Sequence, residues 1–198
     1  MESHQGFLLV ISGPAGVGKD TVWKAASQAL PGFAKALTCT TRPRRAAEEE
    51  GVHYYFVNDE EFDRMIHADE LLEWAFVHGY RYGVPWNSVV SRLTDGQDVV
   101  CVIDVQGAQR IRGIFPTALL VFITPPAGHE EDVLKKRIEE RGGADEAEIA
   151  TRIRTAFWEL THIPLYDYQI VNDEVPRAAQ ELCDIVAAEK EKRTSSES

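Results

Sequence analysis

The chain has 198 residues, 44% of them hydrophobic, and a formal net charge of −11. This length fits one globular domain with small inserted subdomains, and the apolar fraction is that of a protein with a sizeable core. The negative charge argues against general nucleic-acid binding, which needs a basic face, and no apolar run approaches the length of a membrane span. The three cysteines are widely spaced and follow no metal-ligand pattern, so we expect buried thiols in a cytoplasmic protein.

The beginning of the chain carries a motif for binding phosphate. An apolar run at residues 7–11 predicts a buried strand, and Gly13, Gly18 and Lys19 then have the spacing of a phosphate-binding loop. The loop consists of Gly13, Pro14, Ala15, Gly16, Val17, Gly18, Lys19, Asp20 and Thr21. Its glycines let backbone N–H groups converge on an anion, and Lys19 adds a full positive charge at the start of a helix. This segment predicts a site for a nucleoside triphosphate.

The residue after the lysine departs from the usual motif, which has a magnesium-binding Ser or Thr at that position. Asp20 stands there, and Thr21 follows it. A carboxylate binds magnesium directly or through water, because hard cations favour oxygen ligands. Asp20 can equally face away and leave the hydroxyl of Thr21 as the ligand, so both alternatives stay open.

Apolar runs alternate with amphipathic stretches along most of the chain. The predicted strands cover residues 8–12, 98–104, 119–123 and 168–171, and the predicted helices cover residues 19–30, 88–94, 106–115, 130–141, 146–160 and 175–192. This repetition indicates an α/β fold with a central parallel sheet flanked by helices. In such a fold, ligands bind at the carboxyl ends of the strands, where the loop 13–21 lies. The charged, Ser-rich end 190–198 is expected to fray.

Residues 34–84 interrupt this alternation and predict a small mixed β/α insert. Short strands are expected at residues 34–41, 52–57, 72–77 and 80–84, which are rich in Thr, Val, Tyr and Phe. Between them Asn58 caps a predicted helix, and Glu61 is placed to reach back to the cap. Residues 40–45 (Thr-Thr-Arg-Pro-Arg-Arg) bring hydroxyl and guanidinium groups into one short loop, and guanidinium forks match phosphate oxygens. The insert therefore predicts a second anion site.

Glu73 lies in an apolar run beside Trp74, where a carboxylate needs a partner or a ligand. A carboxylate accepts two N–H bonds from a base with adjacent donors, and guanine offers a ring N–H beside an amino group. The hydroxyl groups of Tyr54 and Tyr82 can complete a phosphate site, although both residues also suit ordinary strand positions.

The order of these motifs resembles that of the bacterial guanylate kinase family over nearly the whole chain. The matching segments are residues 13–21, 40–45, 51–56, 72–75, 77–83, 103–107 and 166–173, together with Arg137 and Arg141. The resemblance implies a P-loop kinase fold with its core at residues 1–33, 85–125 and 162–198, a GMP-binding insert at 34–84 and a helical lid at 126–161. It also implies ATP-dependent phosphorylation of GMP and dGMP in purine metabolism, with magnesium.

Residue roles follow from the same resemblance. The loop 13–21, Arg141 and Asn172 are implied to bind ATP; Thr38, Arg42, Arg45, Tyr54, Glu73, Tyr82 and Asp104 to bind GMP; Lys19, Arg45, Arg137 and Arg152 to act in phosphoryl transfer; and Asp20, Thr21 and Asp104 to hold magnesium. Phosphoryl transfer needs mainly alignment and charge neutralisation, which is why arginines from the insert and the lid are implied together. The choice between a monomer and a homo-oligomer stays open.

Asp20, Val84 and Val102 depart from the family pattern. Val84 stands where family members usually carry a Thr or Ser that hydrogen-bonds the guanine oxygen, so looser base selectivity is a hypothesis. Val102 stands where an acidic residue usually precedes the Ile-Asp-Val-Gln-Gly run. Two other functions are considered: a related kinase that phosphorylates ribose 1,5-bisphosphate, and a non-catalytic guanylate kinase-like interaction module. Glu73 argues against the first, and Lys19 with the intact loop glycines argues against the second.

Overall fold

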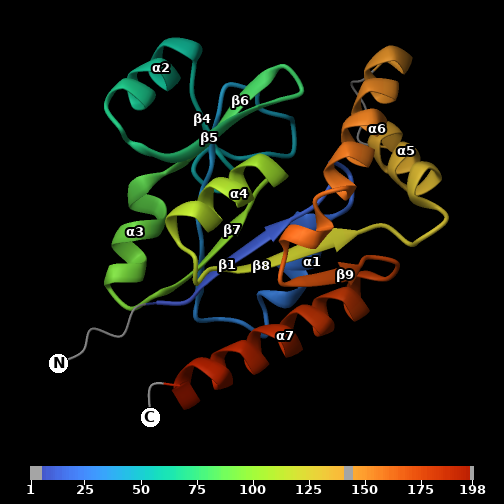
Figure 1. The fold of residues 1–198 in the computed structure, drawn as a ribbon. Coiled ribbons are helices and arrows are strands. Elements are labelled where there is room, and N and C mark those ends of the chain that lie inside the picture. Colours follow the sequence, from blue (N-terminus) through green and yellow to red (C-terminus); the bar gives the residue numbers. More distant parts are fainter. Residues whose placement is uncertain (1–5, 141–144, 197–198) are drawn as a thin grey trace. The chain divides into compact units, whose positions relative to one another are not determined.

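The computed structural model describes residues 6–140 and 145–196. Its main sheet has five strands in the order β2 (Phe33–Lys35), β7 (Asp98–Val102), β1 (Leu8–Ser12), β8 (Leu119–Thr124) and β9 (Tyr168–Val171) (Figure 1). Every residue of β1 and β8 is buried, which explains why both strands are continuous apolar runs in the sequence. The predicted fold class, a central parallel sheet flanked by helices, is confirmed.

The helices of the described residues are α1 (Lys19–Ala26), α2 (Asp59–His67), α3 (Trp86–Thr94), α4 (Val105–Ile114), α5 (Glu130–Glu140), α6 (Glu146–Leu160) and α7 (Val175–Ser196), with a short 3₁₀ turn at Ile163–Leu165. None of these helices is both long enough and apolar enough to cross a lipid bilayer. Packing divides the chain into two compact units. The first consists of Ala34–Cys101 and Gln106–Ala118 with the chain up to Leu9; the second consists of Val10–Phe33, Val102–Val105 and the chain from Leu119 onward.

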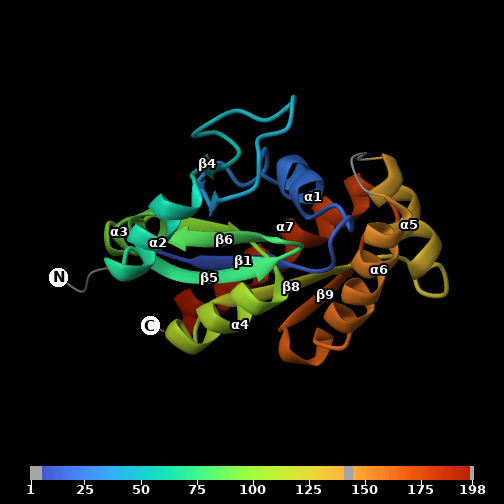
Figure 2. The ribbon, with the colours of Figure 1, turned by 90° about the horizontal axis from the view of Figure 1, so that it is seen from above.

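The first unit contains a four-stranded mixed sheet in the order β4 (Tyr55–Phe56), β3 (Cys39–Thr40), β6 (Tyr80–Pro85) and β5 (Leu71–Val77). β5 and β6 form an antiparallel hairpin, whose strands lie side by side in Figure 2. Its two-residue turn is His78-Gly79, with φ of 49° and 83°. Two successive positive φ angles match the right-handed twist of the flanking strands, so this turn sets the register of the hairpin.

The second unit contains the loop after β1 and the helices that follow β8 and β9. α1 and α7 pack against each other, and α5 lies beside α6 (Figures 1 and 2). Strand β9 pairs with β8 in parallel, from Val121 opposite Tyr168 to Thr124 opposite Val171. This pairing brings the segment after β9 to the same edge as the end of β8.

Two predicted strands of the insert were wrong in extent. Residues 34–41 do not form one strand, because they belong to two sheets. The N–H of Ala36 donates to the carbonyl of Val100 in the five-stranded sheet, whereas Cys39 pairs with Gly83 in the four-stranded sheet. The predicted strand 52–57 is reduced to β4, because the N–H groups of Val52 and His53 bond back to the carbonyl of Glu49 in a turn.

Helix ends also differ from the prediction. α1 ends at Ala26 rather than residue 30, because Ala29 and Leu30 close shorter bonds to the carbonyls three residues before them. α7 continues to Ser196 instead of fraying, and the hydroxyls of Thr194 and Ser195 bond to carbonyls one turn earlier. The cap of α2 is confirmed, since the Asn58 side chain accepts the N–H of Glu61 at 2.8 Å. The carboxylate of Glu61 pairs with Arg64 rather than reaching back to the cap.

Candidate active site

The loop after β1, in the second unit, forms the first candidate site. Gly13, Gly16 and Gly18 have positive φ angles of 140°, 85° and 97°. A side chain is also excluded at Gly13 by contact, because a Cβ there would lie 2.2 Å from the carbonyl oxygen of Ile123. Gly18 is the N-cap of α1 and begins that helix with a left-handed backbone. The predicted arrangement of strand, glycine-rich loop and helix is therefore present.

Lys19, at the first position of α1, points its ammonium group back toward the loop. Its Nζ donates to the carbonyl oxygens of Gly13 at 2.5 Å and Pro14 at 3.1 Å. Asp20 and Thr21 follow in the first turn of α1, and both are exposed. Among the described residues no group of three or more His, Cys, Asp or Glu forms a metal cage. The available donors are hard oxygens, which suit a magnesium ion that completes its coordination with water and substrate phosphates.

Glu159 of α6 places a buried carboxylate against this loop, which the sequence reasoning did not anticipate. Only 5% of the residue is exposed, and its Oε2 accepts the backbone N–H of Ala15 at 3.4 Å. Burial raises the pKa of Glu159 to about 7, with a further increase from the charge of Asp104, while the charge of Lys19 opposes the shift. Glu159 and Asp104 therefore lie within electrostatic reach of each other in the second unit.

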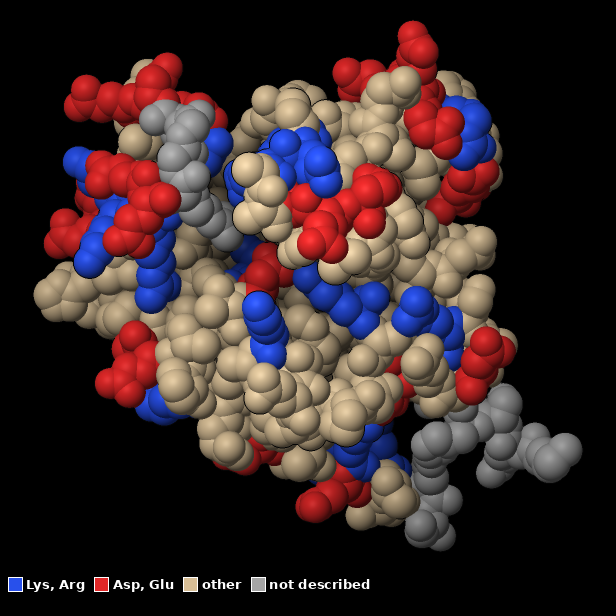
Figure 3. Space-filling view, turned by 180° about the vertical axis from the view of Figure 1, so that it is seen from behind, with Lys and Arg blue, Asp and Glu red and all other residues tan. Residues whose placement is uncertain are grey.

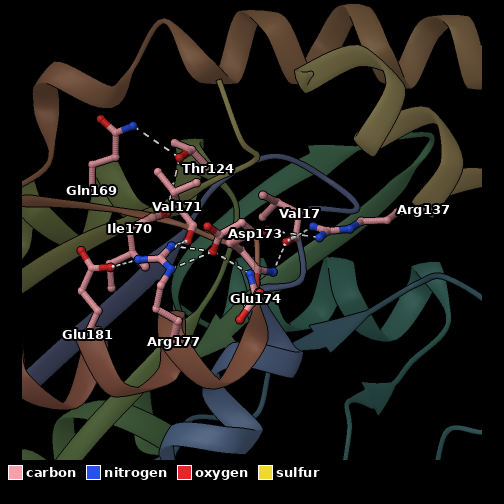
Figure 4. A network of polar contacts seen from close by, with 11 residues as sticks. Val17, Thr124, Arg137, Gln169, Ile170, Val171, Asp173, Glu174, Arg177 and Glu181 are labelled. Atoms are coloured by element: carbon pink, nitrogen blue, oxygen red, sulfur yellow. Dashed lines mark hydrogen bonds and ion pairs between the residues drawn. The ribbon is translucent and has the colours of Figure 1, made fainter. Parts of the chain in front are cut away.

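Asn172, immediately after β9, ties the loop to the sheet. Its side-chain amide is 1% exposed and donates to the carbonyl oxygen of Val17 at 2.7 Å. Arg137 of α5 donates to the same carbonyl at 2.8 Å and to the carbonyl of Asn172 at 3.2 Å (Figure 4). A Cβ at Gly18 would lie 2.5 Å from the Asn172 amide nitrogen, so glycine is required there by this contact as well. The predicted residues Asn172 and Arg137 thus meet at the phosphate-binding loop.

An ion-pair network holds the turn that carries Asn172. Arg177 of α7 pairs with Asp173 at 2.7 Å and Glu181 at 2.9 Å, and it also donates to the carbonyl of Val171 (Figure 4). These contacts hold the pKa of Asp173 below its ordinary value, chiefly through the hydrogen bonds from Arg177. The residues on both sides of Asn172 are thus bonded to α7, which holds its backbone beside the loop, and the bond to Val17 orients its side-chain amide.

Arg152, another arginine of the predicted lid, is paired within its own helix. Arg152 of α6 donates to the carboxylate of Glu148 one turn earlier, with 15% of its side chain exposed. Arg141 lies outside the described residues. On the face shown in Figure 3, lysines and arginines lie among acidic side chains. This agrees with the ion pairs that several arginines form with carboxylates.

In the first unit, strand register brings residues distant in sequence onto one face of the mixed sheet. Thr40 lies opposite Tyr82, and Val84 lies opposite Glu73. Because side chains alternate along a strand, Tyr82 and Val84 share a face of β6, and their opposite residues share it too. This face therefore carries Thr40, Tyr82, Val84 and Glu73 together.

Arg42 is the centre of the second candidate site. It is only 9% exposed, and its Nε donates to the hydroxyl of Tyr82 at 3.2 Å. The guanidinium carbon lies 5.5 Å from the ring centre of Tyr54 and 5.8 Å from that of Phe56. Tyr54 in turn contacts Tyr82 edge to face at 6.1 Å. The structure thus brings together Arg42, Tyr54 and Tyr82, as the resemblance implied.

The loop after Arg42 folds around the carboxylate of Glu48. The guanidinium of Arg42 donates to Oε1 at 2.7 Å and to Oε2 at 3.0 Å, and the backbone N–H of Arg45 donates to Oε2 at 2.9 Å. Thr38 is buried just before β3, and its carbonyl accepts the N–H of Tyr55 at 3.0 Å. Two predicted residues, Thr38 and Arg45, therefore border the same cluster.

Glu73 points its carboxylate at helix α4. The residue is 5% exposed, and a Cβ at Gly107 would lie 2.8 Å from Oε2 and 3.0 Å from Oε1. Only glycine at position 107 lets the carboxylate approach the helix this closely. Burial, reinforced by the nearby charge of Glu73, raises the pKa of the Cys101 thiol, and burial likewise raises that of Cys39 to about 12. Glu73 is therefore a buried acidic group within a sheet face that otherwise presents Tyr82 and Val84.

A sequence profile of the guanylate kinase family matches residues 5–189. The chain belongs to the guanylate kinase family. A guanylate kinase of Caldanaerobacter subterraneus subsp. tengcongensis is 42% identical, covering 94% of this chain and 89% of the relative. One of Enterococcus faecalis is 44% identical, covering 94% of this chain and 91% of the relative. The crystal structure of guanylate kinase from Anaplasma phagocytophilum matches with a TM-score of 0.77 at 32% identity, over 96% of this chain and 88% of that one.

Membership of the guanylate kinase family confirms the recognition made from the order of the motifs and confirms the P-loop kinase fold. It also confirms that the chain is an enzyme, a nucleotide-binding transferase of the kinase type. The comparisons favour neither of the two other functions considered from the sequence.

The contacts that three residues make at the candidate sites were not predicted from the sequence. Glu159 could have been found from helical spacing, because Ile153, Ala156 and Glu159 are the buried positions of α6. Gly107 sits inside a helix, where an unexplained glycine indicates a close packing contact. Nothing in the sequence distinguishes Glu48, because it is one of three successive glutamates.

Proposed function

We propose that this guanylate kinase transfers the γ-phosphate of ATP to GMP, and to dGMP, giving ADP and GDP or dGDP. An oxygen of the acceptor phosphate attacks the γ-phosphorus, and the bond from that phosphorus to the β–γ bridging oxygen breaks, so that ADP leaves with that oxygen. Family membership supports this reaction. So does the presence of two chemically different sites, a glycine-rich loop with a lysine in the second unit and an arginine–tyrosine cluster beside a buried carboxylate in the first.

In this proposal the phosphate-binding loop holds ATP. The backbone N–H groups of residues 13–21 and the ammonium of Lys19 bind the β- and γ-phosphates, and α1 adds the positive end of its dipole. Lys19 then exchanges the neutral carbonyls of Gly13 and Pro14 for charged phosphate oxygens, a stronger interaction. Magnesium, which neutralises developing charge on the phosphates, would be held by oxygens of Asp20, Thr21 and Asp104. Asn172 and Arg141 complete the ATP site.

The sheet face of the first unit binds GMP. Arg42, Arg45, Tyr54 and Tyr82 hold the acceptor phosphate, and Glu73 accepts the ring N–H and amino group of guanine. Thr38 lines the same site. Val84, opposite Glu73, is fully buried and offers no hydroxyl to the guanine oxygen. Because this hydroxyl is missing, we expect base selectivity to be looser than in relatives that carry a hydroxyl at this position.

Phosphoryl transfer itself needs positive charge placed around the moving group. Lys19, Arg45, Arg137 and Arg152 supply it in this proposal. Arg137 bonds to the carbonyls of Val17 and Asn172, so it is already anchored at the loop. Arg152 is paired with Glu148 and would exchange this carboxylate for phosphate oxygens.

The observation that carries the proposal is the buried carboxylate of Glu73 on the face that also carries Tyr82, the hydrogen-bond partner of Arg42. A phosphate site beside an acceptor for adjacent N–H donors fits a guanine nucleotide, whereas a ribose bisphosphate has no N–H to offer. The test is a coupled assay of ADP formation with GMP, dGMP, IMP and AMP, using Lys19→Met as the inactive control. We expect turnover of GMP and dGMP, and a lower rate of turnover of IMP. Equal turnover of AMP and GMP would contradict the role of Glu73, and an exclusive preference for GMP would contradict the looser selectivity.

A further inference from the structure

Glu48 is the carboxylate around which the arginine loop of the first unit is folded. Its Oε1 and Oε2 accept two N–H bonds from Arg42, at 2.7 and 3.0 Å, and Oε2 also accepts the backbone N–H of Arg45 at 2.9 Å. Its backbone N–H bonds to the carbonyl of Arg45 at 3.1 Å, and its own carbonyl accepts Arg44 at 3.2 Å. One side chain thus connects the two arginines that the proposed function assigns to the acceptor phosphate.

These contacts leave Arg42 little freedom. A guanidinium has five N–H donors in a fixed plane. In the structure, Nε bonds to Tyr82, one Nη1 hydrogen to the carbonyl of Pro43, and the other two bonds go to Glu48. The plane of the group is therefore fixed from three directions, and its central carbon lies over the ring of Tyr54. An Nη2 hydrogen is left to point at a ligand.

Glu48 also stays charged at neutral pH. Burial by itself would raise its pKa, but the hydrogen bonds from Arg42 and from the Arg45 amide outweigh burial, so the pKa of Glu48 is held below its ordinary value. With 13% of the Glu48 side chain and 9% of the Arg42 side chain exposed, the pair is screened only weakly by solvent. Removing the carboxylate alone would leave a buried guanidinium without its main acceptor.

When the acceptor phosphate binds, the carboxylate of Glu48 can either leave Arg42 or stay bonded to it. If Glu48 gave way to the incoming phosphate, Arg42 would exchange one anion for another, with little gain. If Glu48 stays in place, the phosphate uses the remaining Nη2 hydrogen together with the hydroxyls of Tyr54 and Tyr82. The third bond of Glu48, to the backbone of Arg45, favours the second arrangement, because departure of the carboxylate would also release the loop that carries Arg45.

We propose that Glu48 is a positioning residue, which holds Arg42 and Arg45 in the arrangement that grips the acceptor phosphate and does not itself contact the nucleotide. This inference rests on the proposed function of the first unit as the GMP site.

The test compares Glu48→Gln with Glu49→Gln in the full chain. Both substitutions remove one negative charge from adjacent residues, but Glu49 is exposed and its side chain makes no bond to Arg42 in the described structure. Steady-state assays of ADP formation with GMP and ATP varied in turn would give each Michaelis constant. In Glu48→Gln we expect the KM for GMP to rise at least about tenfold, the loss of one charge-assisted hydrogen bond, while the KM for ATP stays within about twofold. Glu49→Gln should match the wild type, and Glu48→Asp, which keeps the charge, should fall between.

The possible outcomes separate the alternatives. A purely structural role would lower kcat and the melting temperature of Glu48→Gln and leave the KM for GMP unchanged, which would overturn the inference. A lower KM for GMP would overturn it too, because Glu48 would then compete with the phosphate. If the wild type itself formed no ADP with GMP, the proposed function would fail, and the inference with it. If the wild type were active and Glu48→Gln had the same KM for GMP, the inference would be wrong while the proposed function would still hold.

Discussion

The buried carboxylate of Glu159 predicts how the stability of this protein depends on pH. Burial raises its pKa from 4.5 to about 7, and the charges of Lys19 and Asp104 act in opposite directions on top of that effect. In the unfolded chain the same carboxyl is solvated and releases its proton near its ordinary value. Between about pH 4.5 and 7, the folded chain therefore holds a proton that the unfolded chain has lost.

The sign and size of the effect follow from this difference. Because the folded state binds more protons, the free energy of unfolding contributed by Glu159 falls as pH rises through this range and levels off above the folded pKa. A shift of about 2.5 units, at about 1.4 kcal/mol per unit, amounts to about 3 kcal/mol. With 5% of the residue exposed, solvent screening reduces this figure little.

Glu159→Gln keeps the shape of the side chain and removes its titration. Urea unfolding of both proteins at several pH values between 5 and 8, without nucleotide or magnesium, measures the contribution of Glu159 together with its coupling to Lys19 and Asp104. The variant should be about 3 kcal/mol more stable than the wild type at pH 8, and the difference should shrink toward zero near pH 5. Glu146→Gln, at the exposed start of the same helix, serves as the control and should follow the wild type. A difference between Glu159→Gln and wild type that did not change with pH would refute the argument.

Two further substitutions test the sites. Gly107→Ala places a Cβ 2.8 Å from the Glu73 carboxylate and should raise the KM for GMP about tenfold, whereas Gly113→Ala, on the same helix with nothing within 4 Å of its Cβ, should leave it unchanged. Equal effects of the two would show that the close contact does not matter. Asn172→Ala removes the buried donor to the carbonyl of Val17 and should lower the free energy of unfolding by about 1–2 kcal/mol in urea titrations. An unchanged unfolding midpoint would show that this amide does not anchor the loop.

The first candidate site could be predicted because its information is local. Gly13, Gly18 and Lys19 lie within one loop. Glycine is required at the first two positions because of their positive φ angles and their close contacts with residues of the same unit. The apolar runs of β1 and β8 likewise identify buried strands without reference to the rest of the fold.

The second candidate site depends on strand register, which spacing alone does not reveal. Arg42 and Tyr82 meet because β3 pairs with β6, and Glu73 faces Val84 because the register set by the His78-Gly79 turn runs unbroken to that pair. Only the resemblance to a known family connected these residues in advance. Glu48 shows the limit most clearly, since Glu49 and Glu50 follow it and nothing in the sequence says which of the three folds back onto Arg42.

The proposed phosphate-binding groups differ in what they already bind, and this difference decides how each responds to a nucleotide. The hydrogen bonds that Lys19 and Arg137 donate to backbone carbonyls have neutral acceptors, and because a charged phosphate oxygen is a better acceptor, such bonds exchange readily. Arg42 donates to a carboxylate that is itself bonded to a second residue, so exchange would replace one charged acceptor by another and disorder the loop. The bonds of Lys19 and Arg137 should therefore rearrange when ATP binds, whereas the pair of Arg42 and Glu48 should persist when GMP binds. A crystal structure with GMP in which Glu48 had separated from Arg42 would contradict this distinction.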